Sequence, residues 1–125
     1  VNQPYYLQLE DESVYFMAGI CETWHDSAGV PTESIAILTT QANTLAAKVH
    51  DRMPVILEGD DTLIWLEGTS DIIETEKRFD LLGPIDSGRM KYRAVNPIVN
   101  NNQNDVPDCI SEPPVEASTQ LDMGF

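Results

Sequence analysis

The apolar segments of this chain are short, and that shortness limits the folds it can adopt. Representative runs are Ile35-Ala36-Ile37-Leu38 and Val55-Ile56-Leu57, and polar residues follow each of them. No run approaches the roughly 20 apolar residues that a membrane-spanning helix needs, so we expect no membrane segment. Segments of this length predict short strands and helices around one modest core, which suits a chain of 125 residues.

The chain is strongly acidic, with 21 Asp and Glu against 7 Lys and Arg and a formal net charge of -14. This balance argues against the basic surface that ordinary nucleic-acid binding requires. The acidic residues are scattered and apolar runs are plentiful, which argues against a disordered chain. We interpret the acidity as the general surface character of proteins from a salt-loving organism, with an acidic interaction face as the alternative.

The first third of the chain is predicted to be β. Residues 4–9 alternate loosely and residues 14–20 are apolar, so they predict an antiparallel hairpin joined by the acidic turn 10–13. Residues 34–40 are rich in β-branched side chains and predict a third strand.

The middle of the chain changes period. Residues 41–49 predict a helix, because four apolar residues fall on one helical face: Ala42, Leu45, Ala46 and Val49. The helix should end by Asp51, because Pro54 drives Met53 into an extended conformation. Residues 55–57 predict a short buried strand.

Two further helices are predicted. The first covers residues 62–67, with Asp60 or Asp61 as the N-cap and Gly68 closing it. The second covers about 70–82. Its expected apolar side consists of Ile72, Ile73, Phe79 and Leu82.

The remainder of the chain is predicted to hold one strand and a polar end. Residues 90–95 alternate as a strand, and residues 96–105 are a polar run whose Asn side chains either hold an irregular loop or contact a ligand. The chain is expected to fray from about Pro113. The fold class is therefore predicted to be α+β, with strands dominating the first half.

The cysteines and tryptophans are predicted to be structural. Cys21 and Cys109 are interpreted as buried thiols, because a disulfide scaffold would be denser in Cys. Trp24 and Trp65 are expected to pack in or beside the core. His25 lies near Cys21, but a second ligand pair is lacking, so we expect no metal site and no cofactor.

His50 is the side chain best placed for chemistry. It lies at the predicted end of a helix, before the turn Asp51-Arg52-Met53-Pro54, so its imidazole can face a cleft and act as a neutral-pH acid or base. The alternative is a histidine that only satisfies the last carbonyl groups of the helix. Asp51 either orients the imidazole or pairs with Arg52.

Arg52 and Thr39 are the other candidate site residues. The guanidinium of Arg52 is a planar donor group suited to phosphate or carboxylate, and its alternative role is a structural ion pair. Thr39 ends a predicted strand, where polar groups often reach a site. Its alternative role is that of a β-branched residue that suits a strand.

Two segments together carry a resemblance to a known family. They are Ile37-Leu38-Thr39-Thr40-Gln41-Ala42-Asn43 and His50-Asp51-Arg52-Met53-Pro54-Val55-Ile56-Leu57. In this order they closely resemble the SRAP family, the SOS-response-associated peptidases, also called abasic-site processing proteins. Residues 3–6, 17–24 and 99–105 match the family in the same order. We therefore interpret residues 1–113 as the C-terminal part of a SRAP domain and residues 114–125 as a disordered tail.

The resemblance implies a β-rich α+β domain, with antiparallel strands and short helices, that captures abasic sites in single-stranded DNA. In the family, a Cys exposed by removal of the initiator Met condenses with the open-chain sugar aldehyde to form a stable thiazolidine crosslink. An upstream Asn and Glu complete the site with a His. By motif match that His is His50, Arg52 lies near DNA phosphate and Thr39 lines the same pocket.

The departures from the family pattern concern the nucleophile and the phosphate contacts. The family begins Met-Cys-Gly-Arg, and this chain begins after that half, so neither Cys21 nor Cys109 takes the nucleophile's place. Glu22 is not the catalytic Glu. Ile98 and Gln103 stand where we expect basic residues. We expect the N-terminal half to be attached in a longer protein or to act as a separate partner.

Two functions from different classes follow from these observations. The leading one is a cytoplasmic abasic-site processing protein of the DNA damage response, of which this chain is a fragment that lacks the Cys nucleophile. The alternative is a catalytically inactive acidic fragment that acts as a structural or protein-interaction module. A protease acting on other proteins is disfavoured, because that chemistry also requires the nucleophile.

Overall fold

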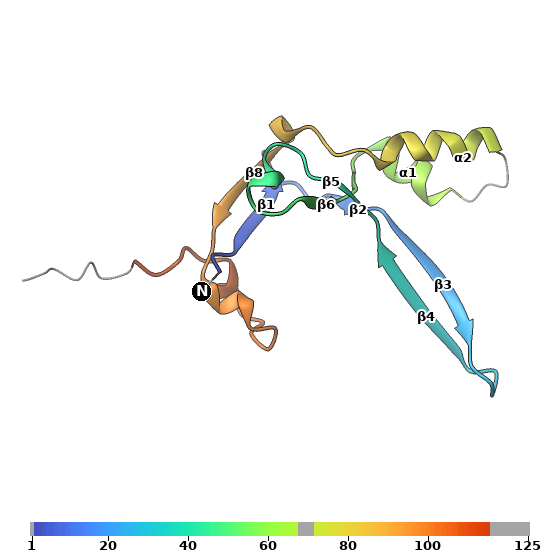
Figure 1. Ribbon diagram of the computed structural model, residues 1–125, viewed down its shortest axis with the longest axis horizontal. Helices are drawn as coiled ribbons and strands as arrows, with labels where there is room; N and C mark the ends of the chain where they lie inside the picture. The colour runs from blue at the N-terminus through green and yellow to red at the C-terminus, as the bar shows by residue number, and fades with distance from the viewer. Residues whose placement is uncertain (1, 68–71, 116–125) are drawn as a thin grey trace, which may run out of the picture. The chain divides into compact units, whose positions relative to one another are not determined.

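The computed structural model describes residues 2–67 and 72–115 of the chain (Figure 1). Its strands are β1 (Tyr5–Leu9), β2 (Phe16–Met17), β3 (Gly19–His25), β4 (Pro31–Ile37), β5 (Thr39–Gln41), β6 (Arg52–Pro54), β7 (Ile56–Leu57) and β8 (Met90–Ala94). Its α-helices are α1 (Asp60–Leu66) and α2 (Ile72–Phe79). Single 3-10 turns cover Ala46–Lys48, Asp80–Leu82, Ser87–Arg89, Pro97–Asn100 and Pro107–Ile110. The α+β class is confirmed, with small antiparallel sheets and short helices.

The described residues form two compact units. The larger comprises residues 7–67 and 72–91, and the smaller comprises residues 2–6 and 92–115. β1 and β8 pair with each other, and each strand contributes residues to both units. The candidate residues Thr39, His50 and Arg52 all belong to the larger unit.

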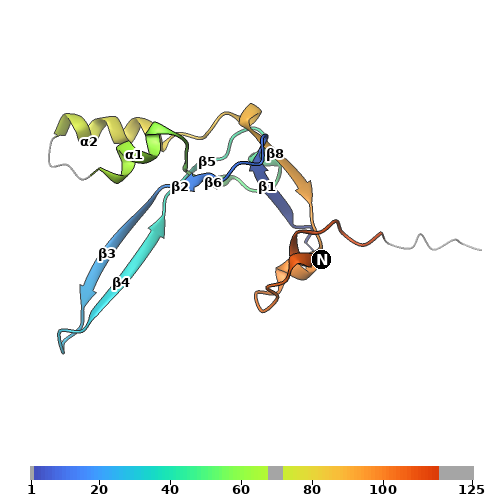
Figure 2. The ribbon, with the colours of Figure 1, turned by 180° about the vertical axis from the view of Figure 1, so that it is seen from behind.

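Three strand pairs of the larger unit begin at one closed cycle of backbone hydrogen bonds. The Ala18 amide donates to the Val55 carbonyl, the Val55 amide to the Leu38 carbonyl, and the Leu38 amide to the Ala18 carbonyl, each at 2.9 Å. These residues, which we call the strand junction, separate β2 from β3, β4 from β5, and β6 from β7. The antiparallel pairs β2–β7, β3–β4 and β5–β6 therefore diverge from the junction. Figures 1 and 2 show β3 and β4 side by side.

Two apolar clusters stabilise the larger unit. The first consists of Leu9, Ala46, Met53, Ile56 and Met90, and the second of Ala18, Val55 and Leu57 with Trp65, Leu81 and Leu82 packed against it. Burial of the predicted strand 55–57 is confirmed. Because Met53 lies between Arg52 and Pro54 in β6, the first cluster buries one face of the strand that carries Arg52.

The predicted hairpin of residues 4–9 and 14–20 is wrong. β1 pairs with β8, and residues 14–20 divide into β2 and the beginning of β3. The division occurs at Ala18, which is completely buried and whose amide and carbonyl bond to two different segments. Such a partner exchange is set by distant parts of the chain, so local alternation does not reveal it.

The predicted helix over residues 41–49 is also wrong. β5 extends to Gln41, and the Ala42 amide donates to the Asp51 carbonyl at 3.0 Å, so pairing with the β6 segment uses the backbone groups that a helix would need. Only Ala46–Lys48 forms a 3-10 turn. The extended conformation predicted at Met53 is confirmed by β6.

The helices differ from prediction mainly at their ends. α1 begins at Asp60 after Gly59, whose φ of 53° favours glycine, so Gly59 and neither aspartate is the N-cap. Asp60 and Asp61 lie in the first turn, where carboxylates interact favourably with the helix dipole. Gly68, Ser70 and Asp71 lie outside the described residues.

The predicted apolar side of the second helix is not a buried side. Ile72, Ile73 and Phe79 of α2 are exposed, whereas Leu82 in the following 3-10 turn packs against the second cluster. The helix therefore presents large apolar side chains to solvent. The predicted strand over 90–95 is confirmed as β8.

Asparagine side chains organise the polar run of the smaller unit. Asn96 Oδ1 accepts a hydrogen bond from the Ile98 amide at the start of the 3-10 turn Pro97–Asn100. Asn100 Nδ2 donates to the Asn2 carbonyl, and Asn104 Nδ2 donates to the Ile98 carbonyl. Of the two roles considered for these asparagines, the described contacts therefore support the loop-holding one.

Candidate functional site

The β5–β6 ladder brings Thr39 and Arg52 to one place. The register pairs Thr39 with Pro54, Thr40 with Met53 and Gln41 with Arg52. Thr39 and Arg52 are thus diagonal neighbours on the same face of a two-stranded ladder, within reach of a long side chain. Met53 is buried on the opposite face of β6, so Arg52 lies exposed on the face that it shares with Thr39.

The Arg52 guanidinium spans that diagonal. Its Nη2 donates to the Thr39 carbonyl at 2.7 Å and contacts Thr39 Oγ1 at 3.0 Å. The contacts described for Arg52 use Nη2 alone, which leaves Nε and Nη1 available. The structural ion pair considered for Arg52 is therefore replaced by a hydrogen-bonded link to Thr39, and Asp51 interacts with His50 instead.

His50 presents Nδ1 to three polar groups of its own segment. The Arg52 amide donates to Nδ1 at 3.0 Å, while the Arg52 carbonyl oxygen and Asp51 Oδ1 each lie 3.1 Å away. A deprotonated Nδ1 accepts from the amide, and a protonated Nδ1 donates to the carboxylate or the carbonyl. The nitrogen therefore has a partner in either protonation state, which suits a group that exchanges protons.

The opposite edge of the His50 ring faces solvent. The side chain is 71% exposed, and the contacts described for it involve Nδ1 and not Nε2. The backbone amide of His50 donates to the Ala46 carbonyl at 2.9 Å, so the 3-10 turn fixes the position of the residue while the ring stays accessible.

Asn43 anchors the loop that carries His50. Its Oδ1 accepts from the Ala46 amide at 2.8 Å, and its Nδ2 donates to the Ile85 carbonyl at 2.9 Å. The residue is only 9% exposed. The sequence pattern did not indicate this role, although Asn side chains often accept a nearby backbone amide at the start of a turn.

The sequence predicts structural roles for the two cysteines and the two tryptophans, and the structure agrees for one residue of each kind. Cys109 is a buried free thiol and Trp65 packs against the second cluster, both as predicted. Cys21 is exposed, so its predicted burial is wrong, and Trp24 is 61% exposed on the hairpin and not packed in or beside the core as expected. Both lie on β3, where every residue after Gly19 is exposed. No helix of the described residues is long and apolar enough to cross a membrane.

Comparison with known protein families gives a match over most of the chain. Residues 1–102 match the family described as SOS response associated peptidase (SRAP). The chain is similar to "Abasic site processing protein YoqW" of Bacillus subtilis, with 32% identity over 107 residues that cover 86% of this chain and 47% of the relative. It is also similar to "Abasic site processing protein HMCES" of Rattus norvegicus, with 32% identity over 96 residues, 76% of this chain and 26% of the relative.

Comparison with solved structures points the same way. A crystal structure of a protein from Bacteroides thetaiotaomicron is similar with a TM-score of 0.74 and 30% sequence identity. The match covers 90% of this chain and 49% of that protein. The chain thus spans about half the length of YoqW and of the Bacteroides protein, and about a quarter of HMCES.

Proposed function

Because the chain belongs to the SOS response associated peptidase family, we propose that it supplies the His50 part of a site that processes abasic positions in single-stranded DNA. Two relatives are named abasic site processing proteins, and the chain spans 47% of one and 26% of the other. The observation that carries the proposal is the arrangement at His50, where Nδ1 has a partner in both protonation states and Nε2 faces solvent.

In this proposal His50 moves the proton that opens the abasic sugar. The step uses the tautomer in which Nδ1 carries a proton and donates to Asp51 Oδ1, 3.1 Å away, so that Nε2 gives and takes the other proton. The imidazolium donates from Nε2 to O4′ as the C1′–O4′ bond breaks, and neutral Nε2 takes a proton from the C1′ hydroxyl that becomes the aldehyde. Single-stranded DNA suits this chemistry, because the lesion can be turned out without unpairing a duplex.

The covalent step in the proposal belongs to the cysteine that the family resemblance implies. Its thiol and amine both add to the C1′ aldehyde carbon, forming C–S and C–N bonds, and the aldehyde oxygen leaves as water. The thiol and amine protons are consumed in forming that water, so no oxidant, reductant or cofactor is needed. Cys21 and Cys109 take no part, because neither stands at the position of that cysteine in the family pattern.

Arg52 is proposed to hold the DNA backbone beside His50. Its link to Thr39 positions the guanidinium, and Nε and Nη1 remain for the oxygens of a phosphate. The net charge of -14 weakens long-range attraction to DNA. A few well-placed contacts and covalent capture offset that loss.

The test is a crosslinking assay on a single-stranded oligonucleotide with one abasic site. This chain is joined behind the cysteine-bearing part of YoqW, and the covalent complex is counted on a denaturing gel. We expect His50→Gln to slow crosslink formation about 100-fold, the lower range for loss of an acid–base group. The other histidine of the chain, His25 on the β3–β4 hairpin, provides the matched control His25→Gln. Equal rates in the two variants would contradict the proposal, and an acidic interaction module would then be the better description.

A further inference from the structure

Gln41 is an exposed polar residue on the face of the β5–β6 ladder that carries the candidate site. Exposure alternates along β5, with Thr39 and Gln41 exposed and Thr40 half-buried. Because alternate side chains of a strand point to the same face, Gln41 shares its face with Thr39 and, across the ladder, with Arg52. Within residues 2–67 and 72–115, no hydrogen bond uses the side-chain amide of Gln41. The amide is therefore available to a ligand of this face.

The pairing pattern places Gln41 close beside Arg52. The Ala42 amide donates to the Asp51 carbonyl at 3.0 Å, so Ala42 and Asp51 form a hydrogen-bonded pair. Along an antiparallel ladder such pairs alternate with non-hydrogen-bonded pairs, in which the Cα atoms are about 4.5 Å apart and the side chains lie closer together. Gln41 and Arg52 form a pair of the second kind. A ligand held by Arg52 therefore lies within reach of Gln41.

Gln41 lies between the two groups that are proposed to meet DNA. Nη2 of Arg52 extends to Thr39, two residues before Gln41, where it contacts the Thr39 carbonyl and Oγ1. His50 lies two residues before Arg52, toward the other end of the ladder, and its Nδ1 is 3.0 Å from the Arg52 amide nitrogen. A DNA strand with one phosphate at Arg52 and its abasic sugar at His50 therefore passes Gln41.

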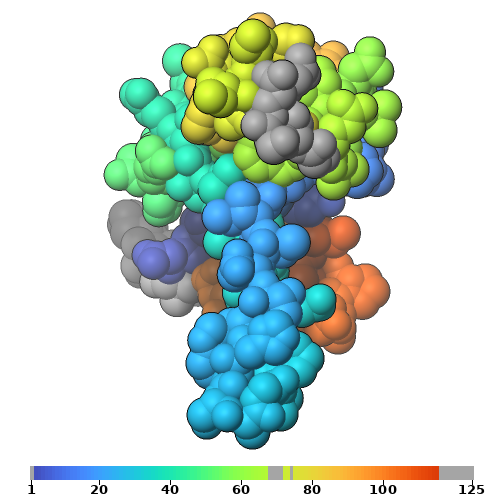
Figure 3. All heavy atoms as spheres, turned by 90° about the vertical axis from the view of Figure 1, so that its right-hand side faces the viewer, coloured from blue at the N-terminus to red at the C-terminus, as the bar shows by residue number. Residues whose placement is uncertain are grey.

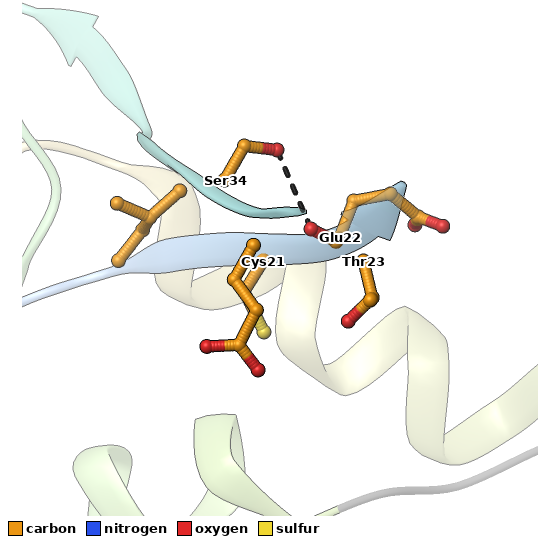
Figure 4. Close-up of a pocket in the computed structure, with 6 residues that line it drawn as sticks. Cys21, Glu22, Thr23 and Ser34 are labelled. Atoms are coloured by element: carbon orange, nitrogen blue, oxygen red, sulfur yellow. Dashed lines mark hydrogen bonds between the residues drawn. The ribbon is translucent and has the colours of Figure 1, made fainter. Parts of the chain in front are cut away.

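The β3–β4 hairpin offers DNA no comparable surface. On the side that Figure 3 displays, no other described segment lies over the hairpin. A hollow of about 300 Å³ on it, whose lining side chains are drawn in Figure 4, includes the carboxylates of Glu22 and Glu33. Residues 1–47 contain no Lys or Arg, so the hairpin carries no Lys or Arg that could meet a phosphate. Such a surface repels DNA, which leaves the face of Arg52 as the better path for the strand.

The side-chain amide of Gln41 matches the edge of a nucleobase. Its oxygen accepts and its nitrogen donates, and it carries no charge that would select a phosphate. Adenine presents the N6 donor beside the N7 acceptor, and glutamine pairs with both at once. In a single strand the Watson–Crick edge is open as well, and there N6 lies beside the acceptor N1. Adenine therefore offers this amide two suitable edges.

We propose that Gln41 reads the base of the nucleotide next to the abasic position and favours adenine there. Gln41 is then a specificity-determining residue, which neither the opening of the sugar nor the covalent step uses. The preference falls on one flank of the lesion, because Gln41 lies on one side of His50. This inference rests on the proposed function, in which Arg52 holds a phosphate and His50 meets the sugar.

The test measures how the crosslinking rate depends on the neighbouring base. The chain is joined behind the cysteine-bearing part of YoqW, and each substrate is a single-stranded oligonucleotide with one abasic site. Adenine, cytosine, guanine or thymine is placed on the 5′ side of the lesion with thymine on the 3′ side, or the reverse. At subsaturating oligonucleotide, we expect adenine on one flank to raise the rate about fivefold or more, the lower range for one amide–base pair.

Two substitutions show whether the preference comes from Gln41. Gln41→Met nearly keeps the length of the side chain and removes both hydrogen-bonding groups, so it should make the rates with the four bases equal. The matched control Gln8→Met should keep the adenine preference, since Gln8 lies on β1, whose partner is β8. A purely structural role for Gln41 would instead lower the four rates together and leave their ratios unchanged.

Two results would overturn the proposal. The first is a Gln41→Met variant that keeps the adenine preference. The second is an unsubstituted protein that crosslinks at the same rate with every base on both flanks, which would reject the role of Gln41 and leave the proposed function standing. The absence of any crosslink, with all of the oligonucleotides, would reject the proposed function and the role of Gln41 with it.

Discussion

Asn43→Ala tests whether one buried amide holds the loop that carries His50. The substitution removes the acceptor of the Ala46 amide and the donor to the Ile85 carbonyl, bonds of 2.8 and 2.9 Å. Loss of one such side-chain bond to a backbone amide costs about 1 kcal/mol. A part-buried carbonyl left without its donor costs about 1–2 kcal/mol more. The expected loss in the free energy of unfolding is therefore about 2–3 kcal/mol, a large part of the roughly 5–15 kcal/mol of a typical domain.

The assay is urea denaturation followed by tryptophan fluorescence, because Trp65 packs against the second apolar cluster. At the usual urea dependence for a small protein, the expected loss lowers the midpoint by about 1–2 M. Thr44→Ala is the neighbouring control, since the Thr44 hydroxyl only donates to the Ser87 hydroxyl at an exposed position. An Asn43→Ala midpoint equal to that of the Thr44→Ala control would refute the anchoring role.

Three further predictions concern the strand junction, the neighbouring Gly19 carbonyl and an exposed carboxylate. Ala18→Leu should lower the free energy of unfolding by about 1–3 kcal/mol, because a larger side chain has no space at a fully buried junction; urea midpoints measure this. Trp65→Phe should cost about 1 kcal/mol in the same assay, because it removes the indole N–H bond to the Gly19 carbonyl at 3.0 Å. Hydrogen bonds from the Ser13 hydroxyl and amide hold the pKa of Asp11 below its usual 3.8, so Ser13→Ala should raise that pKa in an NMR titration. Because the pKa is lowered in the folded chain, the stabilisation by Asp11 is present above the unfolded pKa and is lost as the pH falls through the folded one.

The parts of the fold that follow from neighbouring residues could be predicted from the sequence. The strand over residues 90–95, the burial of residues 55–57 and the extended Met53 before Pro54 depend on local pattern, and the structure has all three. The strand junction could not be predicted in this way. Ala18 exchanges hydrogen bonds with Leu38 and Val55, which lie 20 and 37 positions later in the chain, and nothing in the local alternation reports those partners.

In the candidate site, too, some features follow from the local sequence and others depend on pairing with distant segments. The motif predicts Thr39, His50 and Arg52 as site residues, and the β5–β6 register brings Arg52 to Thr39. The apolar spacing at Ala42, Leu45 and Ala46 predicts a helix over residues 41–49, but it equally fits a loop that packs a single turn into the core. Because a helix was expected there, the anchoring role of Asn43 was not predicted. Propensity was overridden there by pairing with the segment around Asp51.

The exposure of the β3–β4 hairpin could not be predicted from the sequence, for a different reason. Apolar side chains on β3 predict burial from the sequence, and within the described residues their cover is absent. The hydrophobic pattern of a sequence indicates which side chains can be buried, but it does not indicate which polypeptide buries them. For that reason the predicted burial of Cys21 and the predicted core packing of Trp24 are wrong for this chain by itself.

The proposed role of His50 is tested most directly by following the two histidine rings of the 125-residue chain by NMR. A single-stranded oligonucleotide with a tetrahydrofuran abasic analogue is added at low ionic strength, and an intact oligonucleotide of the same sequence serves as the reference. The proposed role predicts a saturable shift of the His50 ring signals that is larger with the abasic strand, while the His25 signals stay in place. Equal shifts of both histidines, or no preference for the abasic strand, would contradict it.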